Sequence, residues 1–293
     1  MSVIKAYSVG NGDMFYINHG SDNFTIVDCC VDDDTEDTIL NEVSELSRQK
    51  GITRFISTHP DDDHIRGLEL LDKKIGILNF YCVRNSVTKP DETDSFKRYR
   101  ELHNSDKAFH ISKGCARRWM NQSNEERKTS GIDILWPDLG NEHFKGALNA
   151  TTKGESPNNI SAIIKYSLSE GVTALWMGDL ETEFMEAIED DLDLPAVDIL
   201  FAPHHGRDSG KIPELMLAKM SPKIIVIGEA PSEHLNYYQG YNTITQNSAG
   251  DILFDCEAGK VHIFTSSVYD VDFLDDESRS SANYYYVGTL KLA

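Results

Sequence analysis

The chain has 293 residues, 48 acidic and 28 basic side chains, a formal net charge of −20 and a pI near 4.8. Its 40% apolar content suits a folded core rather than a disordered chain, and its negative charge argues against loose binding to long nucleic acid. The apolar runs are too short for a membrane helix, and we expect no signal peptide. Five cysteines without a C-x-x-C pair favour a reducing cytoplasm over a disulfide framework.

Short apolar strands alternate with helical stretches along the chain, as in α/β proteins. Strands are expected at residues 2–8, 14–18, 23–28, 53–57, 75–83, 132–136, 160–167, 172–177, 197–201, 223–227, 252–254, 260–265 and 284–292. Helices are expected at residues 35–50, 65–71, 180–189 and 212–219. Because no Pro-, Gly- or Ser-rich linker divides the chain, we predict a single α/β domain over residues 1–293.

The segment at about 84–130 differs from the rest of the chain. Residues 84–128 carry eleven basic and seven acidic side chains, a local excess of four positive charges in a strongly negative protein. One interpretation is a solvated helical insertion, which is the common outcome for mixed charge. The other is a basic wall beside an anionic substrate. The sequence does not choose between them.

Four polar clusters begin where an apolar strand is predicted to end. They are Asp28, the run HPDDDH at 59–64, Gly178-Asp179, and His204-His205-Gly206. In α/β sheets the loops at the carboxyl ends of strands converge, and ligands bind there. We therefore expect these clusters to meet in one site.

The HPDDDH run is the strongest of these signals. Imidazole and carboxylate groups are ligands for borderline divalent metals, and on a tight turn His59 and Asp61 could reach one ion while Asp63 and His64 reach another. The alternative is an acidic turn in which Asp63 caps the following helix. A cap needs one aspartate, and three adjacent carboxylates repel one another without a cation, so the pattern favours metal. Asp62 is expected to face solvent.

The spacing His59-x-Asp61-x-Asp63-His64-x-x-Gly67 resembles the H-x-[HD]-x-D-H-x-x-G signature of the metallo-β-lactamase fold superfamily. Further similarities follow in chain order: GNGD at 10–13 and TIVD at 25–28, NIS at 159–161, GDLE at 178–181, HHGR at 204–207, and a late hairpin at 253–263. These resemble the branch found as the hydrolase domain of the DNA-uptake channel protein ComEC and in its stand-alone relatives. The likeness spans nearly the whole chain and is weakest at 84–150.

The resemblance implies a four-layer αββα sandwich with a metal site at one edge. It places His59 and Asp61 on a first ion and Asp63 and His64 on a second, with Asp179 bridging both and an imidazole of His204 or His205 completing the set. Asp63 and Asp179 are the predicted catalytic residues. Residues expected to support the ligands from behind are Asp28, Asn159 and Ser161. Arg207 and Ser209 could bind a phosphate oxygen, although an ordinary turn pair is an equal alternative.

Two departures from the family pattern concern the first ion. Asp61 stands where many members have histidine, which makes the site harder and suits manganese as well as the favoured zinc. The family's middle histidine has no clear match, because His103, His110 and His143 lie in segments unlike its motif. We therefore expect two ions, the first held weakly or only with substrate.

Two metal ions can activate a water and clamp a leaving oxygen, and this chemistry suits either a carbonyl or a phosphodiester. The family branch, the basic segment and the Arg207/Ser209 pair favour a phosphodiesterase or nuclease acting on a small nucleotide or single-stranded nucleic acid, with no membrane partner. The alternatives are a lactonase or β-lactamase-like hydrolase, and a metal-binding interaction protein without turnover. Cys29 and Cys30 are expected to be buried thiols rather than ligands. The isolated histidines His19, His234 and His262 are expected to be structural or surface residues.

Overall fold

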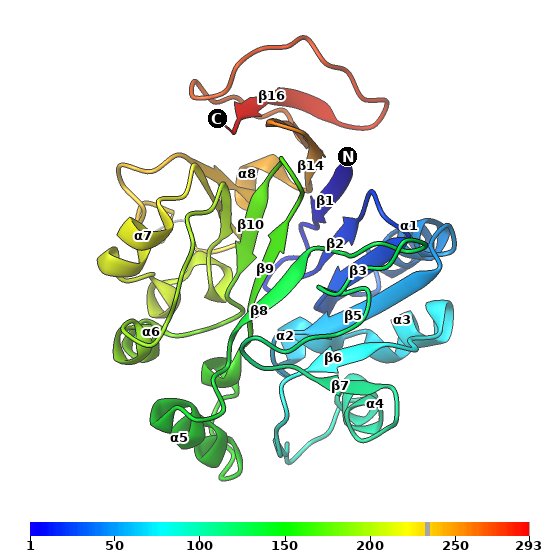
Figure 1. The fold of residues 1–293 in the computed structure, drawn as a ribbon, viewed down its shortest axis with the longest axis vertical. Helices are drawn as coiled ribbons and strands as arrows, with labels where there is room; N and C mark the ends of the chain where they lie inside the picture. Colours follow the sequence, from blue (N-terminus) through cyan, green and yellow to red (C-terminus); the bar gives the residue numbers. More distant parts are fainter. Residues whose placement is uncertain (232–234, 293) are drawn as a thin grey trace.

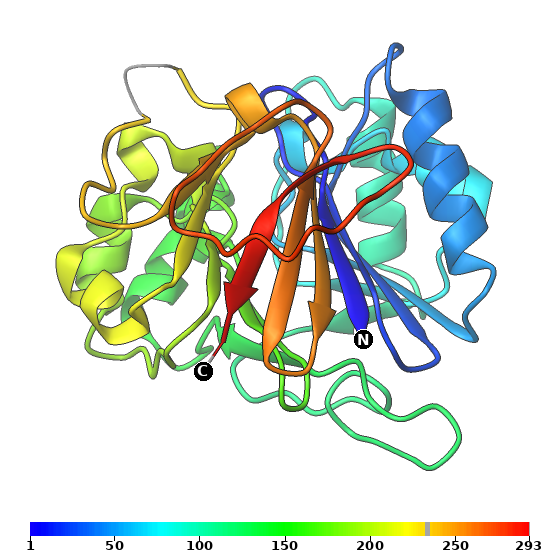
Figure 2. The ribbon, with the colours of Figure 1, turned by 90° about the horizontal axis from the view of Figure 1, so that it is seen from above.

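The computed structural model describes residues 1–231 and 235–292, so His234 lies outside the described residues. A nine-stranded and a six-stranded sheet pack face to face, and helices cover the outer face of each (Figures 1 and 2). The predicted αββα arrangement is confirmed. Every helix in the described ranges is too short or too polar to cross a lipid bilayer.

The larger sheet combines an antiparallel and a parallel half. In spatial order its strands are β16 (Tyr285–Lys291), β15 (Lys260–Thr265), β14 (Ile252–Glu257), β1 (Ser2–Ala6), β2 (Phe15–Asn18), β3 (Asn23–Val27), β5 (Ile52–Ser57), β6 (Phe80–Cys82) and β7 (Ala108–His110). Strands β3, β5, β6 and β7 are parallel, so their carboxyl ends lie along one edge. The two-residue strand β4 (Cys29–Cys30) lies outside this order and bridges to residues 65 and 66.

The smaller sheet is built in the same way. Its order is β13 (Thr243–Thr245), β12 (Ile224–Ile227), β11 (Ile199–Phe201), β10 (Thr173–Trp176), β9 (Ile163–Ser167) and β8 (Ile132–Trp136). Strands β10 to β13 are parallel, whereas β8 and β9 run antiparallel to their neighbours. The sequence pattern did not predict β13, because a strand of three residues with one buried side chain, Ile244, carries too weak a periodicity.

The aromatic core holds the two sheets at a fixed distance. Phe15 and Phe254 of the larger sheet pack edge-on against Phe201 of the smaller one, and the rings of Phe201 and Trp176 stack at 4.7 Å between centroids. All four side chains are buried. Tightly packed rings deform little, so this core fixes how the carboxyl edges of the two sheets face each other.

The helices lie outside the sheets. They are α1 (Glu36–Ser47), α2 (Asp62–Ile65), α3 (Leu68–Ile75), α4 (Asp94–His103), α5 (Glu142–Thr151), α6 (Thr182–Ile188), α7 (Glu214–Met220) and α8 (Gln246–Ala249). Helices α1, α3 and α4 lie on the larger sheet's side, and α5, α6 and α7 on the smaller sheet's side (Figure 1). The sequence pattern did not predict α5 or α8.

The helix predicted at 65–71 is divided in two. Gly67 has a φ of 79°, a left-handed conformation that ends α2 and starts α3. The N-cap of α2 is Asp61, whose carboxylate accepts a hydrogen bond from the backbone of Asp62, so Asp63 is not the cap that the alternative interpretation of this run assigned to it. Because α3 continues to Ile75, the strand predicted at 75–83 shortens to β6.

The segment at 84–130 is only partly helical in the structure. It contains one helix, α4, and the strand β7, which extends the larger sheet, and the remainder is irregular. Five of its eleven basic side chains form ion pairs with nearby carboxylates. The ion-paired cations are Lys89, Lys97, Arg98, Arg100 and Arg127. For these five residues the structure supports the solvated interpretation rather than a continuous basic wall.

Candidate metal centre

The carboxyl ends of four parallel strands, two from each sheet, meet around Asp179. Asp28 follows β3, His59 follows β5, Asp179 follows β10 and His204 follows β11. The Oδ1 atom of Asp179 lies 2.9 Å from His64 Nε2. Its Oδ2 atom faces three further imidazoles, with Nε2 distances of 3.6 Å to His205, 3.8 Å to His204 and 4.0 Å to His59. The convergence predicted from the strand ends is therefore observed, and both His204 and His205 face Asp179.

A buried carboxylate orients His64. The Nδ1 atom of His64 lies 2.9 Å from Asp28 Oδ2, and Asp28 also accepts hydrogen bonds from the backbone and hydroxyl of Thr58, at 2.7 and 2.6 Å. The carboxylate thus holds the proton on Nδ1 and directs Nε2 toward Asp179. The predicted supporting position of Asp28 is observed, whereas the sequence analysis missed Thr58.

His205 has a carboxylate partner that the sequence analysis also missed. Asp13, in the turn between β1 and β2, places Oδ1 3.1 Å from His205 Nδ1, and His205 Nε2 lies 3.4 Å from Asp63 Oδ2. The Asp13 backbone donates a hydrogen bond to the Asp63 carbonyl. Gly12 allows this approach, since a Cβ there would lie 2.6 Å from that carbonyl oxygen. The Gly-Asp pair in the opening turn was the available signal.

His204 is oriented by a hydroxyl group. Its Nδ1 atom lies 2.9 Å from Ser209 Oγ, so Ser209 contacts a histidine of the centre. The predicted role of Ser209 in substrate binding stays a prediction. The guanidinium of Arg207 donates to Asn11 Oδ1. His204 and His205 have φ values of 52° and 55°, an unfavourable left-handed conformation in which both imidazoles nevertheless face Asp179.

Ser161 supports Asp179 from behind. Its hydroxyl accepts a hydrogen bond of 3.0 Å from the backbone nitrogen of Asp179. A Cβ on Gly178 would lie 2.7 Å from Ser161, so only glycine permits this close packing. Asn159 makes two hydrogen bonds with Glu181, one to its carboxylate and one from its backbone, and thereby fixes the segment after Asp179. Ser161 and Asn159 therefore position the backbone around Asp179, and neither contacts the imidazoles of the centre in these hydrogen bonds.

Asp61 is occupied by other partners. Its Oδ1 atom lies 2.9 Å from Lys89 Nζ and accepts from the backbone of Asp62, and Lys89 also pairs with Asp62 at 3.0 Å. His59 therefore faces the centre while Asp61 faces Lys89. The assignment of Asp61 to a first ion stays a prediction, and its carboxylate would have to leave Lys89 to fulfil it.

Burial and mutual charge set the protonation of the centre. Burial and the neighbouring His64 lower the pKa of His59 to about 4, which leaves it neutral as a metal ligand requires. Burial alone would raise the pKa of Asp63, but its contact with His205 and the charge of His64 lower it to about 2. Burial opposes protonation of His205, yet Asp13 and Asp179 raise its pKa to about 10. A cation would replace the protons that now balance these carboxylates.

The residues present fit a divalent metal ion. Single ligand atoms of Asp13, His64, Asp179 and His205 lie within 4.8 Å of one another. His59 Nε2 is buried without a hydrogen-bond partner, and His64 Nε2 and His205 Nε2 are buried beside the carboxylates of Asp179 and Asp63, at 2.9 and 3.4 Å. Buried polar atoms without partners are costly, and an ion that accepts nitrogen and oxygen ligands would satisfy them.

Metal removal should therefore destabilise the protein. At a free ion concentration about a thousand times the Kd, binding to the folded state alone stabilises it by about 4 kcal/mol. We expect a chelator to lower the Tm and added Zn²⁺ or Mn²⁺ to restore it, as measured by thermal unfolding. Ca²⁺ at the same concentration is the control, because it prefers six to eight oxygen ligands. A Tm that does not respond to Zn²⁺ or Mn²⁺ would contradict the assignment.

Comparisons with known proteins give likenesses at low identity. No family model and no curated protein matches the sequence. Among solved structures, a novel metallo hydrolase from the hyperthermophilic archaeon Ignicoccus hospitalis KIN4/I matches 86% of this chain and 99% of its own, with a TM-score of 0.49 and 12% identity. A proposed Zn-dependent hydrolase of the metallo-β-lactamase superfamily from Thermotoga maritima matches 79% of this chain and 78% of its own, with a TM-score of 0.34 and 10% identity.

Proposed function

We propose that this protein is a metal-dependent hydrolase of the metallo-β-lactamase superfamily and that its substrate is a phosphodiester. The observation that carries the proposal is the Asp179 carboxylate, which is 2% exposed and faces four imidazoles contributed by the ends of both sheets. A structural salt bridge needs one histidine, whereas four converge on this carboxylate and the buried Nε2 atom of His59 has no hydrogen-bond partner. When bound, a divalent ion would supply Lewis acidity and lower the pKa of a water.

Neighbouring side chains fix the orientation of three histidines in the centre. Asp28 directs His64, Asp13 directs His205, and Ser209 contacts the outer nitrogen of His204. Partners of this kind fix the ring orientation and the tautomer of a ligand histidine. Asp63, whose pKa is lowered to about 2, is an ionised carboxylate on the opposite side of His205 from Asp13. Such a preorganised set needs little rearrangement when it binds and acts.

A phosphodiester is favoured over a lactam or lactone by the charges beside the centre and by the motif likeness to the ComEC branch. Lys89 pairs with Asp61 and Asp62 in the metal motif, and Arg207 directly follows the histidine turn. Both cations could contact the non-bridging oxygens of a phosphate. The charge of −20 disfavours long duplex nucleic acid, which leaves small nucleotides and single strands. Zinc is the favoured ion and manganese the alternative.

The test is a substrate panel on protein that has been stripped and reloaded with Zn²⁺ or Mn²⁺. It comprises bis(p-nitrophenyl) phosphate, single-stranded DNA, a cyclic dinucleotide, a chromogenic lactam and a simple lactone. We expect metal-dependent cleavage of at least one phosphodiester. Turnover of the lactam or lactone alone would overturn the substrate class. Stoichiometric metal binding with no turnover of any of the five would favour an interaction protein.

A further inference from the structure

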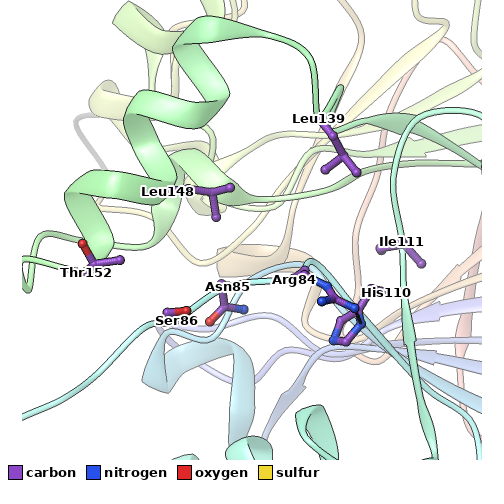
Figure 3. Close-up of a pocket in the computed structure, with 8 residues that line it drawn as sticks. All are labelled: Arg84, Asn85, Ser86, His110, Ile111, Leu139, Leu148 and Thr152. Atoms are coloured by element: carbon purple, nitrogen blue, oxygen red, sulfur yellow. Dashed lines mark hydrogen bonds between the residues drawn. The ribbon is translucent and has the colours of Figure 1, made fainter.

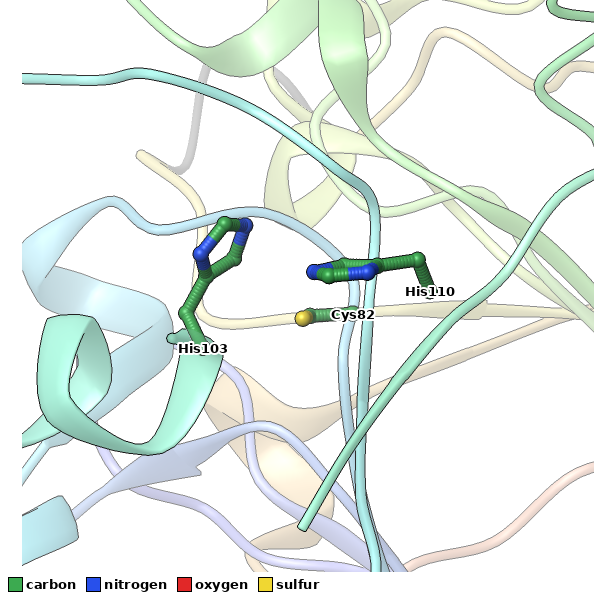
Figure 4. Close-up of side chains that lie close together, drawn as sticks. All are labelled: Cys82, His103 and His110. Atoms are coloured by element: carbon green, nitrogen blue, oxygen red, sulfur yellow. The ribbon is translucent and has the colours of Figure 1, made fainter. Parts of the chain in front are cut away.

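A second group of metal-ligating side chains lies one strand away from the centre along the edge of the larger sheet. Cys82 is the last residue of β6 and His110 the last of β7, and the two are register partners. Cys82 also pairs with Ser57, two residues before His59. His103, the last residue of α4, completes the group. Single ligand atoms of the three residues lie within 4.8 Å of one another, and Figure 4 shows their side chains converging.

His103 already has the tautomer that a metal ligand needs. Its Nδ1 atom lies 3.2 Å from Asn104 Oδ1, an acceptor, which assigns the ring proton to Nδ1. Nε2 then carries the lone pair and accepts only a longer hydrogen bond, of 3.3 Å, from the backbone of Asn85. Since His103 is 8% exposed, this lone pair has little contact with solvent. A metal ion bound to His103 Nε2 would replace this weak hydrogen bond from the Asn85 backbone by a stronger coordinate bond.

His110 directs an unsatisfied atom into the group. Its Nε2 atom is buried and has no hydrogen-bond partner, whereas Nδ1, on the exposed side, lies 3.2 Å from a nitrogen of Arg84. Coordination through Nε2 requires the ring proton on Nδ1, so Arg84 would have to give up this contact. Arg84 is exposed, and an exposed hydrogen bond of this kind is cheap to exchange with water.

One member of the group lines a cavity. His110 and Arg84 line a cavity of about 280 Å³ between the β6–β7 edge and helix α5, and Figure 3 shows their side chains together at its wall. Cys82 itself is fully buried, and burial raises the pKa of its thiol to about 12, so an ion must displace a proton to bind the sulfur. Ions with a high affinity for thiolate meet this condition, whereas Mg²⁺ and Ca²⁺ do not.

We propose that Cys82, His103 and His110 form a second metal site that binds a thiophilic divalent ion such as Zn²⁺ or Co²⁺ independently of the centre around Asp179. Three protein ligands leave one position of a tetrahedral ion for a water or an exogenous ligand, as in catalytic zinc sites. The donor sets distinguish the two sites, because the group offers a sulfur ligand whereas the four clustered residues at the centre offer only nitrogen and oxygen.

The experiment is a Co²⁺ titration of the stripped full-length protein, followed by absorption spectroscopy. A sulfur-to-cobalt charge-transfer band in the near ultraviolet reports the second site, whether or not the protein hydrolyses anything. We expect this band in the wild type and its loss in Cys82→Ser, with the visible cobalt absorption of the centre retained. Cys115→Ser is the matched control and should keep the band. His110→Gln should weaken the site by about 10- to 100-fold or more.

Two further variants sharpen the test. Arg84→Ala removes a positive charge and frees Nδ1 of His110, so it should tighten Co²⁺ binding at this site alone. Cys30→Ser checks one of the two thiols beside the HPDDDH run, and loss of the band in this variant would overturn the assignment. So would a band that survives in Cys82→Ser, or a wild type without any band. If Cys82→Ser does not fold, the half-exposed His110→Gln decides the same question.

Discussion

Replacing Asp179 by asparagine should reduce phosphodiester hydrolysis by about three orders of magnitude. The carboxylate faces all four imidazoles of the centre, so its loss removes both the anionic ligand and several kcal/mol of charge stabilisation, at about 1.4 kcal/mol for each factor of ten. The amide has nearly the same shape, and the hydrogen bond from the backbone nitrogen of residue 179 to Ser161 does not involve the side chain. Steady-state kinetics on bis(p-nitrophenyl) phosphate, together with circular dichroism, would measure both effects.

Asp62→Asn is the matched control for this experiment. It is the same chemical change within the metal motif, but the Asp62 side chain is 49% exposed and pairs with Lys89 instead of the centre. We expect activity within a few-fold of the wild type, since exposed ion pairs contribute about 0–1 kcal/mol. Equal loss in both variants would mean that charge in the loop matters rather than the position of Asp179. Full activity in Asp179→Asn would remove the central role assigned to this residue.

Replacing Asp28 by asparagine should weaken metal binding by about 10- to 100-fold. The carboxylate accepts from three donors: the Thr58 backbone, the Thr58 hydroxyl and His64 Nδ1. An amide has one acceptor oxygen, so its NH₂ group must face a donor or force His64 into the tautomer that carries the proton on Nε2. Asparagine tolerates the φ of 57° at this position, which separates the electronic effect from backbone strain. Competition with a chromophoric chelator would measure the affinity.

Asp32→Asn provides the comparison for Asp28→Asn. Asp32 is exposed in the following loop, and its side chain bonds only to Thr35 and Asp34 among the described residues. We expect its metal affinity to equal that of the wild type. If Asp28→Asn also binds metal normally, then the tautomer of His64 does not depend on Asp28, and the ordering proposed for this histidine is wrong.

The local pattern of the chain located most of the centre. Apolar strands end at Asp28, His59, Asp179 and His204, and parallel strands bring their carboxyl ends together, so the meeting of these residues was predictable. The repulsion within the HPDDDH run pointed to a cation before any distance was known. The same reasoning could not determine which way each side chain turns. Asp61 turns to Lys89, and Ser209 turns to His204.

The amino-acid sequence by itself predicted alternating strands and helices in one α/β domain, because hydrophobic periodicity is a local property. The αββα architecture and the set of metal ligands were predicted from the resemblance of its motifs to the metallo-β-lactamase fold superfamily. Tertiary structure alone decided the partners. Asp13 and His205 are 192 positions apart, and Cys82, His103 and His110 belong to two strands and a helix that no short motif connects. Contacts of this kind depend on the packing of the two sheets and on strand register, which emerge only when the whole chain has buried its apolar faces.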